Sequence, residues 1–199
     1  MYKIIFRLLV LAIAALPFHP AIAQTEVEVD FVRPGMDYAK YDKFLVRPLD
    51  ISDVRLIPPP WVEGEAATPR AWDISKKNAA HLREQYRNAM QKQLQEVGGY
   101  TLVTEPEEGA LAVEIEIISL TPWASPDGEV VTKGSGEMTF RAEIRDAMTR
   151  EILVIHEGDT PVGDDYNEHT EFSVEQNVNA LFEAWGEFLR TSLENAKKG

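Results

Sequence analysis

The sequence predicts an α+β fold: a mostly antiparallel sheet of about four to five strands, with two amphipathic helices packed on one of its faces. Two periodicities support this prediction. Apolar and polar residues alternate over residues 111–117, whereas apolar residues recur every three or four positions over 79–97 and 178–193. Because the predicted strands are apolar on one side only, we expect the second face of the sheet to stay open to solvent.

The first half of the chain predicts a short strand over 41–48, preceded by an edge strand in which Val27, Val29 and Phe31 alternate with charged residues. A long loop follows at about 50–73, because neither period continues there. The first helix carries an apolar stripe at Ala79, Leu82, Tyr86, Met90, Leu94 and Val97. Gly98 and Gly99 end this helix, as a left-handed cap requires.

The second half predicts strands and then a closing helix. Asp146 to Thr149 form the turn of a hairpin, and Ser173 with Gln176 has the spacing of a capping box at the start of the helix. Its apolar stripe consists of Val178, Leu181, Phe182, Trp185, Leu189 and Leu193. The predicted strands lie at residues 100–104, 111–117, 138–144 and 151–157.

Residues 1–23 have the pattern of a secretory leader. Lys3 and Arg7 accompany an apolar run, and Ala21-Ile22-Ala23 fits a signal peptidase, so we expect cleavage after Ala23 and a periplasmic or secreted product. The uninterrupted apolar run is shorter than the roughly 20 residues that span a bilayer core, so no stable membrane anchor is expected after cleavage. Residues 24–199 are then expected to form a single α+β domain.

The expected mature chain is strongly acidic and has no cysteine. Removal of Lys3 and Arg7 leaves 20 − 2 = 18 basic residues against 33 acidic ones, a net charge of −15. Such a charge repels phosphate backbones, so we expect no nucleic-acid partner. The absence of cysteine excludes thiol catalysis, thiolate metal sites and a lipid-acceptor cysteine.

The loop at about 50–73 is the best candidate for partner binding. It combines three successive prolines with two tryptophans, and tryptophan is enriched at protein–protein interfaces. An alternative is that these rings fold back over the edge of the sheet. The candidate residues, including one tryptophan beside a later proline pair, are Pro58, Pro59, Pro60, Trp61, Trp72 and Trp123.

Catalytic, cofactor and metal sites are not expected. Ser135 lies between glycines but lacks the G-x-S-x-G elbow of a hydrolase, and the chain has no P-loop or dinucleotide motif. Histidines and carboxylates crowd the segment 156–171, yet a calcium loop counted from Asp165 would have Thr170 where glycine is needed. An acidic, hydrated loop explains this segment, which comprises His156, Asp159, Asp164, Asp165, Glu168, His169 and Glu171.

The stretch Val32 to Val46, with its Tyr41-Asp42-Lys43 lead into a strand, resembles the start of a bacterial envelope family, domain of unknown function 3313. The first helix, the hairpin at Asp146 and the closing helix with Ala184-Trp185 follow in the order of that family. The resemblance implies a small exported protein, often a lipoprotein, with no assigned catalytic residues. Two positions depart from the family pattern: Ala23-Gln24 replaces the lipobox cysteine, and Arg150 replaces a turn glycine, which predicts a different turn type.

Three classes of function follow from these observations. We expect a non-enzymatic accessory or binding protein of the periplasm, with an envelope protein as its partner. A small-molecule or metal carrier is the alternative, and a hydrolase of unknown substrate is a less favoured one. Physiological partner, oligomeric state and cation binding by residues 156–171 are left open by the sequence.

Overall fold

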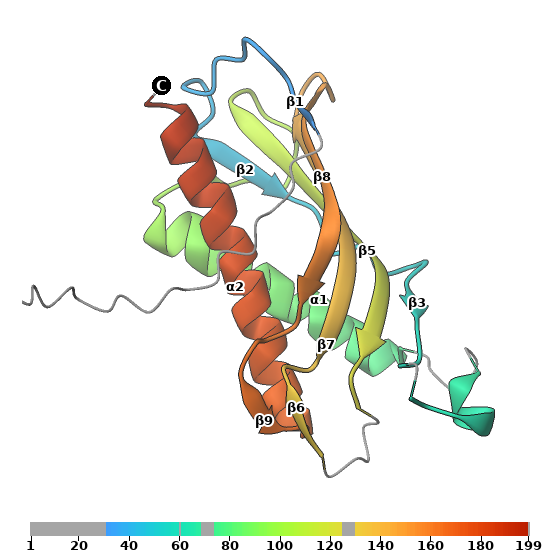
Figure 1. The fold of residues 1–199 in the computed structure, drawn as a ribbon. Coiled ribbons are helices and arrows are strands. Elements are labelled where there is room, and N and C mark those ends of the chain that lie inside the picture. The colour runs from blue at the N-terminus through green and yellow to red at the C-terminus, as the bar shows by residue number, and fades with distance from the viewer. Residues whose placement is uncertain (1–30, 60, 69–73, 125–129, 199) are drawn as a thin grey trace, which may run out of the picture.

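The computed structural model describes residues 31–59, 61–68, 74–124 and 130–198 (Figure 1). The predicted leader, most of the strand predicted around Val27 and Val29, Pro60 and Trp72 lie outside the described residues. The elements are β1 (Phe31–Val32), β2 (Lys43–Val46), β3 (Arg55–Leu56), the 3₁₀ helix η1 (Gly64–Ala67), α1 (Lys76–Met90), the π-helix η3 (Gln91–Val97), β4 (Thr101–Leu102), β5 (Ala110–Pro122), β6 (Val131–Lys133), β7 (Gly136–Asp146), β8 (Ile152–Pro161), β9 (Tyr166–Glu168) and α2 (Glu171–Ala196).

The main sheet has seven strands in the order β1-β8-β7-β5-β2-β4, with β3 also paired to β5. Its central strands β5, β7 and β8 are antiparallel, but β2 runs parallel to both β5 and β4. The α+β class and the two helices are confirmed, whereas the predicted count of four to five strands is wrong. β4 lies within the strand predicted at 100–104, and β1 begins at Phe31, the last residue of the predicted edge strand. β3 was not predicted, because its two residues are too few to show a period in the sequence.

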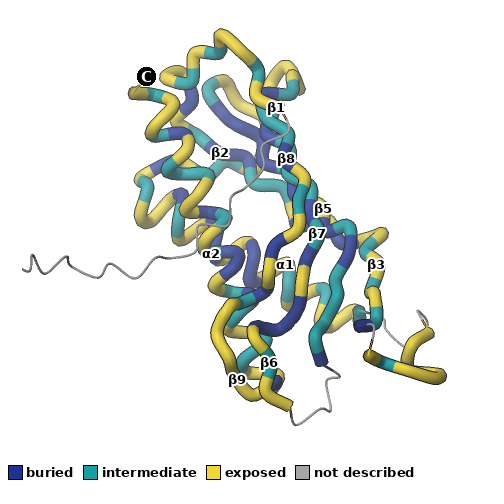
Figure 2. Tube along the Cα trace, in the orientation of Figure 1, coloured by how far each residue is buried: buried dark blue, intermediate teal, exposed yellow. Residues whose placement is uncertain are grey.

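The alternating pattern of β5 determines which face of the sheet holds the core. Leu111, Val113, Ile115 and Ile117 belong to the buried core, whereas Glu114 and Glu116 alternate with them and line the opposite face. Figure 2 shows buried positions along the central strands. Burying each of these side chains contributes roughly 1.5–3 kcal/mol. The aromatic part of the core pairs Tyr86 edge-on with Phe182 at 5.7 Å and Phe140 with Trp185 at 4.5 Å, measured between ring centroids.

Both predicted helices form, but one starts earlier than expected. Gly99 has φ +70°, which confirms the left-handed end of the first helix, now continued beyond Met90 as a π-helix. In α2 the N-cap is Thr170, whose Oγ1 accepts from the Ser173 amide at 3.1 Å, while Ser173 Oγ accepts from the Thr170 amide at 2.9 Å. The predicted cap at Ser173 is therefore wrong: Ser173 is the third helical residue of the same kind of box. Among the described residues, no helix has the length and apolarity needed to cross a membrane.

The β7–β8 hairpin keeps a left-handed residue at its turn. Arg150 has φ +62°, so it adopts the left-handed conformation that glycine takes freely. The Asp146 carboxylate supports the turn by accepting from the amides of Met148 at 3.0 Å and Thr149 at 2.9 Å. Tyr41 also donates its hydroxyl to Asp146 at 2.9 Å, which ties the turn to the segment before β2.

A second, two-stranded sheet, β6 with β9, lies beside the beginning of α2 (Figure 1). Next to this sheet, the turn at Gly134 crosses the turn at Gly163 in close contact. Gly134 has φ +73°, and a Cβ added there would lie 2.1 Å from the Gly163 carbonyl oxygen. Asn177 of α2 donates its amide to Ser135 Oγ at 2.8 Å, and the Gly134 amide donates to the Asp165 carbonyl at 2.8 Å. These contacts fix the small sheet to the helix.

Candidate functional site

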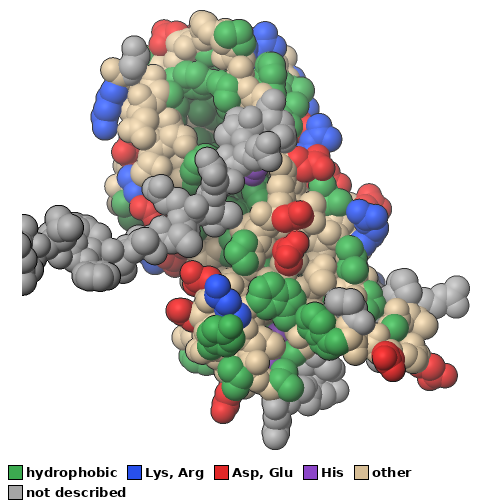
Figure 3. All heavy atoms as spheres, in the orientation of Figure 1, with side chains coloured by type: hydrophobic (Ala, Val, Ile, Leu, Met, Phe, Trp, Pro, Cys, Tyr) green, Lys and Arg blue, Asp and Glu red, His purple; other side chains and the backbone are tan. Residues whose placement is uncertain are grey.

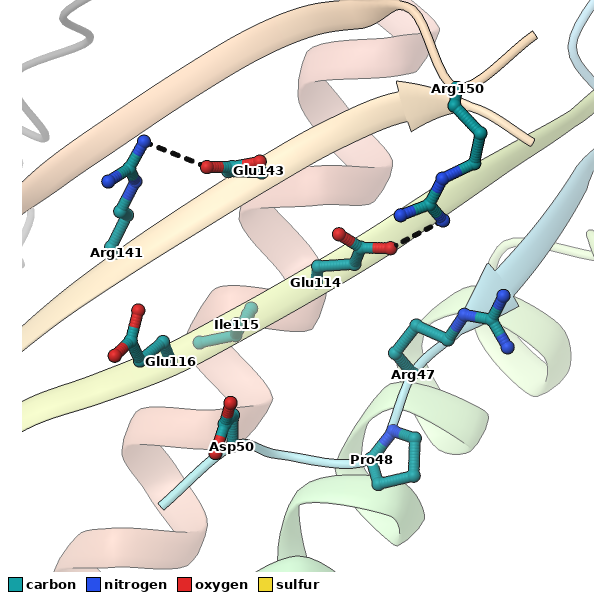
Figure 4. Close-up of a pocket in the computed structure, with 9 residues that line it drawn as sticks. All are labelled: Arg47, Pro48, Asp50, Glu114, Ile115, Glu116, Arg141, Glu143 and Arg150. Atoms are coloured by element: carbon teal, nitrogen blue, oxygen red, sulfur yellow. Dashed lines mark hydrogen bonds and ion pairs between the residues drawn. The ribbon is translucent and has the colours of Figure 1, made fainter. Parts of the chain in front are cut away.

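The face of the main sheet that the helices leave uncovered carries a hollow of about 650 Å³ (Figure 4). The hollow lies over the central strands, with one wall contributed by the segment after β2 and another by the β7–β8 turn. Seven of its nine lining residues carry a charged group. The lining residues are Arg47, Pro48, Asp50, Glu114, Ile115, Glu116, Arg141, Glu143 and Arg150.

Strand register assembles these side chains. Glu114 lies opposite Glu143, and Glu116 lies opposite Arg141, so the polar half of each strand contributes to the same face. Asp50 lies beside Glu116, because the backbones of these two residues form an isolated parallel bridge. Residues far apart in the chain thus share one surface that rests on regular strands.

Five of the side chains on this face form an alternating chain of charges. Arg141 contacts Glu143 at 2.8 Å, and Glu143 also pairs with Arg145. Arg145 reaches Glu114 at 3.4 Å, and Glu114 in turn accepts from Arg150 at 2.7 Å. The order Arg141, Glu143, Arg145, Glu114, Arg150 leaves each inner member with two partners of opposite charge. We call these residues the ion-pair chain.

Other charged groups of the hollow lie outside the ion-pair chain. Asp50 accepts from the amide and the hydroxyl of Ser52 at 3.0 and 2.7 Å, and these hydrogen bonds lower the pKa of its carboxyl. Within the described residues, Arg47 and Glu116 have no side-chain hydrogen bond or ion pair. Asp50, Glu116 and Arg47 are therefore charged side chains of the hollow that lie outside the ion-pair chain, and such groups are suited to binding charged partners.

The described members of the predicted binding site are Pro58, Pro59, Trp61 and Trp123, and none of them lines this hollow. The Ile57 amide donates to the Leu120 carbonyl at 2.8 Å, so the start of the proline run follows the far end of β5. Pro58 is half-buried, Pro59 is buried, Trp61 is 61% exposed and Trp123 is half-buried. Exposed Trp61 does not fold back over the sheet. The segment predicted as an unstructured loop also contains β3 and η1.

The residues considered for catalysis or metal binding have other surroundings. Ser135 is buried and accepts a hydrogen bond from the Asn177 amide, a group that cannot act as a base. His156 packs edge-on against Phe140 at 5.2 Å between ring centroids, and His169 is buried beside the N-cap of α2. In the ranges that the structure describes, no three histidine or acidic side chains are placed to hold a metal ion.

Sequence reasoning missed the charged hollow in part. The alternation of residues 137–145 indicates that Arg141, Glu143 and Arg145 face solvent, and Glu114 was expected on the open face. No local pattern indicates that Arg47, Asp50 and Arg150 join them. Their position depends on the parallel pairing of β2 and on the hairpin turn.

The fold and site define a two-layer α+β protein with one helix-covered sheet face and one open, charged face. The chain belongs to the family described as "Protein of unknown function (DUF3313)", whose sequence model matches residues 23–189. This membership confirms the resemblance seen in the sequence. A search of curated proteins gives no match.

Several solved structures are similar to this chain at low sequence identity. A Xanthomonas campestris protein of family DUF330 has a TM-score of 0.47 at 9% identity, covering 84% of this chain and 94% of its own. A variant of the PelC dodecamer from Paraburkholderia phytofirmans has a TM-score of 0.41 at 13% identity, covering 82% and 95%. A minor lipoprotein from Acinetobacter baumannii has a TM-score of 0.38 at 10% identity, covering 76% and 94%.

Proposed function

We propose that this chain is a non-enzymatic binding protein of the bacterial cell envelope that holds a protein partner against the open, charged face of its sheet. The single observation that carries the proposal is the hollow on that face, built from regular strands and lined by ionised groups. The leader predicted over residues 1–23 and the family resemblance support the location. An intact mass starting at Gln24, without an acyl group, would test export and cleavage.

Two physical arguments favour binding over the other classes. An acid catalyst needs a carboxyl with a raised pKa, whereas the pKa of Asp50 in the hollow is lowered. A carrier of apolar molecules needs space between sheet and helices. Tyr86, Met90 and Phe182 occupy that region and are at most 1% exposed.

The test is site-specific photo-crosslinking in the native envelope. A photoreactive residue replaces Glu116 in the hollow or, as the matched control, exposed Glu84 on α1. We expect one protein to crosslink from position 116 and not from 84, and the purified partner to bind Arg47→Glu at least about tenfold more weakly than wild type. Equal crosslinking from both positions, or unchanged affinity of the variant, would contradict the proposal.

A further inference from the structure

The end of the molecule formed by β6, β9 and the first turn of α2 exposes apolar side chains (Figure 3). Val131 is 64% exposed, Tyr166 74% and Phe172 67%, and Val130 beside them is 46% exposed. We call these four residues the apolar tip. Val131 and Tyr166 lie on the same face of the small sheet. Tyr166 pairs directly with Lys133, and Lys133 is two residues from Val131 on the same strand, so all three side chains point to one side.

Hydrogen bonds connect the apolar tip to the start of α2. The His169 amide donates to the Val130 carbonyl at 2.8 Å, and Ser173 Oγ donates to the Glu168 carbonyl at 2.6 Å. The capping box at Thr170 then fixes the helix that carries Phe172. A preorganised apolar surface loses little conformational entropy when a partner binds.

The segments that surround the apolar tip, which we call its rim, are acidic, and most of their carboxylates have no cationic partner among the described residues. Segments 130–137 and 162–175 carry six carboxylates and a single lysine. Glu175 lies 3.3 Å from His81 Nε2. The other five carboxylates have no side-chain hydrogen bond or ion pair to any described residue, and they are Glu137, Asp164, Asp165, Glu168 and Glu171. This differs from the open face, where the ion-pair chain neutralises its own glutamates.

Charge complementarity selects the partner. An anionic lipid surface and a second copy of this acidic chain would both place like charges against the rim, which is unfavourable. We propose that the apolar tip binds a segment of another protein in which basic and apolar residues alternate. This inference goes beyond the proposed function, which places a partner on the open face.

The probe is a short synthetic peptide in which lysines alternate with leucines, and its affinity for the mature protein is measured by calorimetry. One comparison peptide replaces the lysines by glutamates, and another replaces the leucines by serines. We expect saturable one-to-one binding of the lysine-leucine peptide only, weakened by salt because the rim charges are exposed. Equal binding of the lysine-serine peptide would overturn the proposal, since it would reflect net charge alone.

Paired variants locate the site. Tyr166→Ser with Phe172→Ser should weaken binding at least about tenfold, whereas Val97→Ser with Phe188→Ser, which removes exposed apolar groups elsewhere, should leave it unchanged. Asp165→Asn with Glu168→Gln should weaken binding, in contrast to the equally charged control Glu96→Gln with Glu105→Gln. Thermal unfolding checks that every variant is folded.

Three results would overturn the inference. The first is equal loss of binding in a control pair. The second is binding to phosphatidylethanolamine/phosphatidylglycerol vesicles that depends on Tyr166 and Phe172, which would indicate a lipid partner. The third is a dimer in sedimentation velocity that the same double variant dissociates, which would indicate a second copy. Arg47→Glu should leave peptide binding intact, so failure of the proposed function at the open face is distinguishable from failure here.

Discussion

The open face of the main sheet and the surroundings of the apolar tip differ in whether their carboxylates are paired with cations. On the open face, Glu114 and Glu143 each pair with two arginines. At the apolar tip, Asp165 and Glu168 have no such partners among the described residues. We therefore expect the paired glutamates of the open face to contribute to folding stability, whereas the unpaired carboxylates beside the tip can contribute to binding with little effect on stability. The comparison predicts which substitutions cost stability.

The crossing beneath the apolar tip should give the largest effect. Gly134→Ala forces a Cβ against the Gly163 carbonyl oxygen at 2.1 Å and places alanine at φ +73°. We expect the free energy of unfolding to fall by at least about 3 kcal/mol, measured by urea denaturation. The matched control is Gly35→Ala, which has φ +71° with nothing within 4 Å of the added Cβ, and which should cost only about 1 kcal/mol. Similar losses in both would mean that the crossing is not tightly packed.

Breaking the ion-pair chain should give the next largest effect. Arg145→Ala removes the shared partner of Glu143 and Glu114, whose side chains are 16% and 28% exposed, and should cost about 1–3 kcal/mol. Asp165→Asn at the apolar tip should change stability by less than about 0.5 kcal/mol, since its carboxylate has no side-chain partner among the described residues. Chemical denaturation of the two variants measures this contrast directly. Equal effects would remove the distinction between the two regions.

The buried histidine beside the apolar tip should make stability depend on pH. Burial lowers the pKa of His169 from its ordinary value of 6.5, so the folded state binds its proton less readily than the unfolded chain. The unfolding free energy should therefore fall as the pH drops below about 6.5, and this contribution should level off below the folded-state pKa. Urea midpoints of wild type and His169→Gln, compared between about pH 7.5 and pH 5, should diverge in slope. Parallel profiles would exclude His169 as the titrating group.

The turn at the margin of the open face should give the smallest effect. Arg150→Gly relieves a positive φ, which stabilises by about 1 kcal/mol, but it removes a half-exposed ion pair to Glu114 worth about 0.5 kcal/mol. We expect a net gain of a few tenths of a kcal/mol in thermal unfolding. Arg150→Ala keeps the strain and loses the pair, so it should be less stable than both. A glycine variant that is less stable than the alanine variant would show that the backbone is not strained.

Much of the fold could be predicted because its long elements carry their own periods. β5, β7, β8, α1 and α2 each repeat a pattern over several residues, and each lies where the sequence indicates. β3 has only two residues and therefore no period, so it was missed. The N-cap was misplaced because Thr170 and Ser173 have the same spacing as Ser173 and Gln176, and only the backbone shows which pair caps the helix.

The candidate site could be predicted only where it follows from alternation. Glu114 and Arg141 belong to strands with a clear polar side, whereas Arg47 and Asp50 reach the hollow through a parallel pairing with β5. The apolar tip was also missed. Val131 and Tyr166 lie in strands of three residues each, and these strands pair although they are far apart in the sequence. Pairings between distant segments depend on tertiary packing rather than on local pattern.

The position of β2 has a consequence for biogenesis. β2 lies between β4 and β5, and both follow it in the chain, separated from it by the first helix. During synthesis its residues Lys43–Val46 are made first, and both of their hydrogen-bonding edges remain open until residues 101–113 exist. The β7–β8 hairpin has no such delay. A nascent chain therefore carries β2 without its partner strands until residues 101–113 are made, and a chaperone that covers residues 43–46 would protect it from wrong pairing.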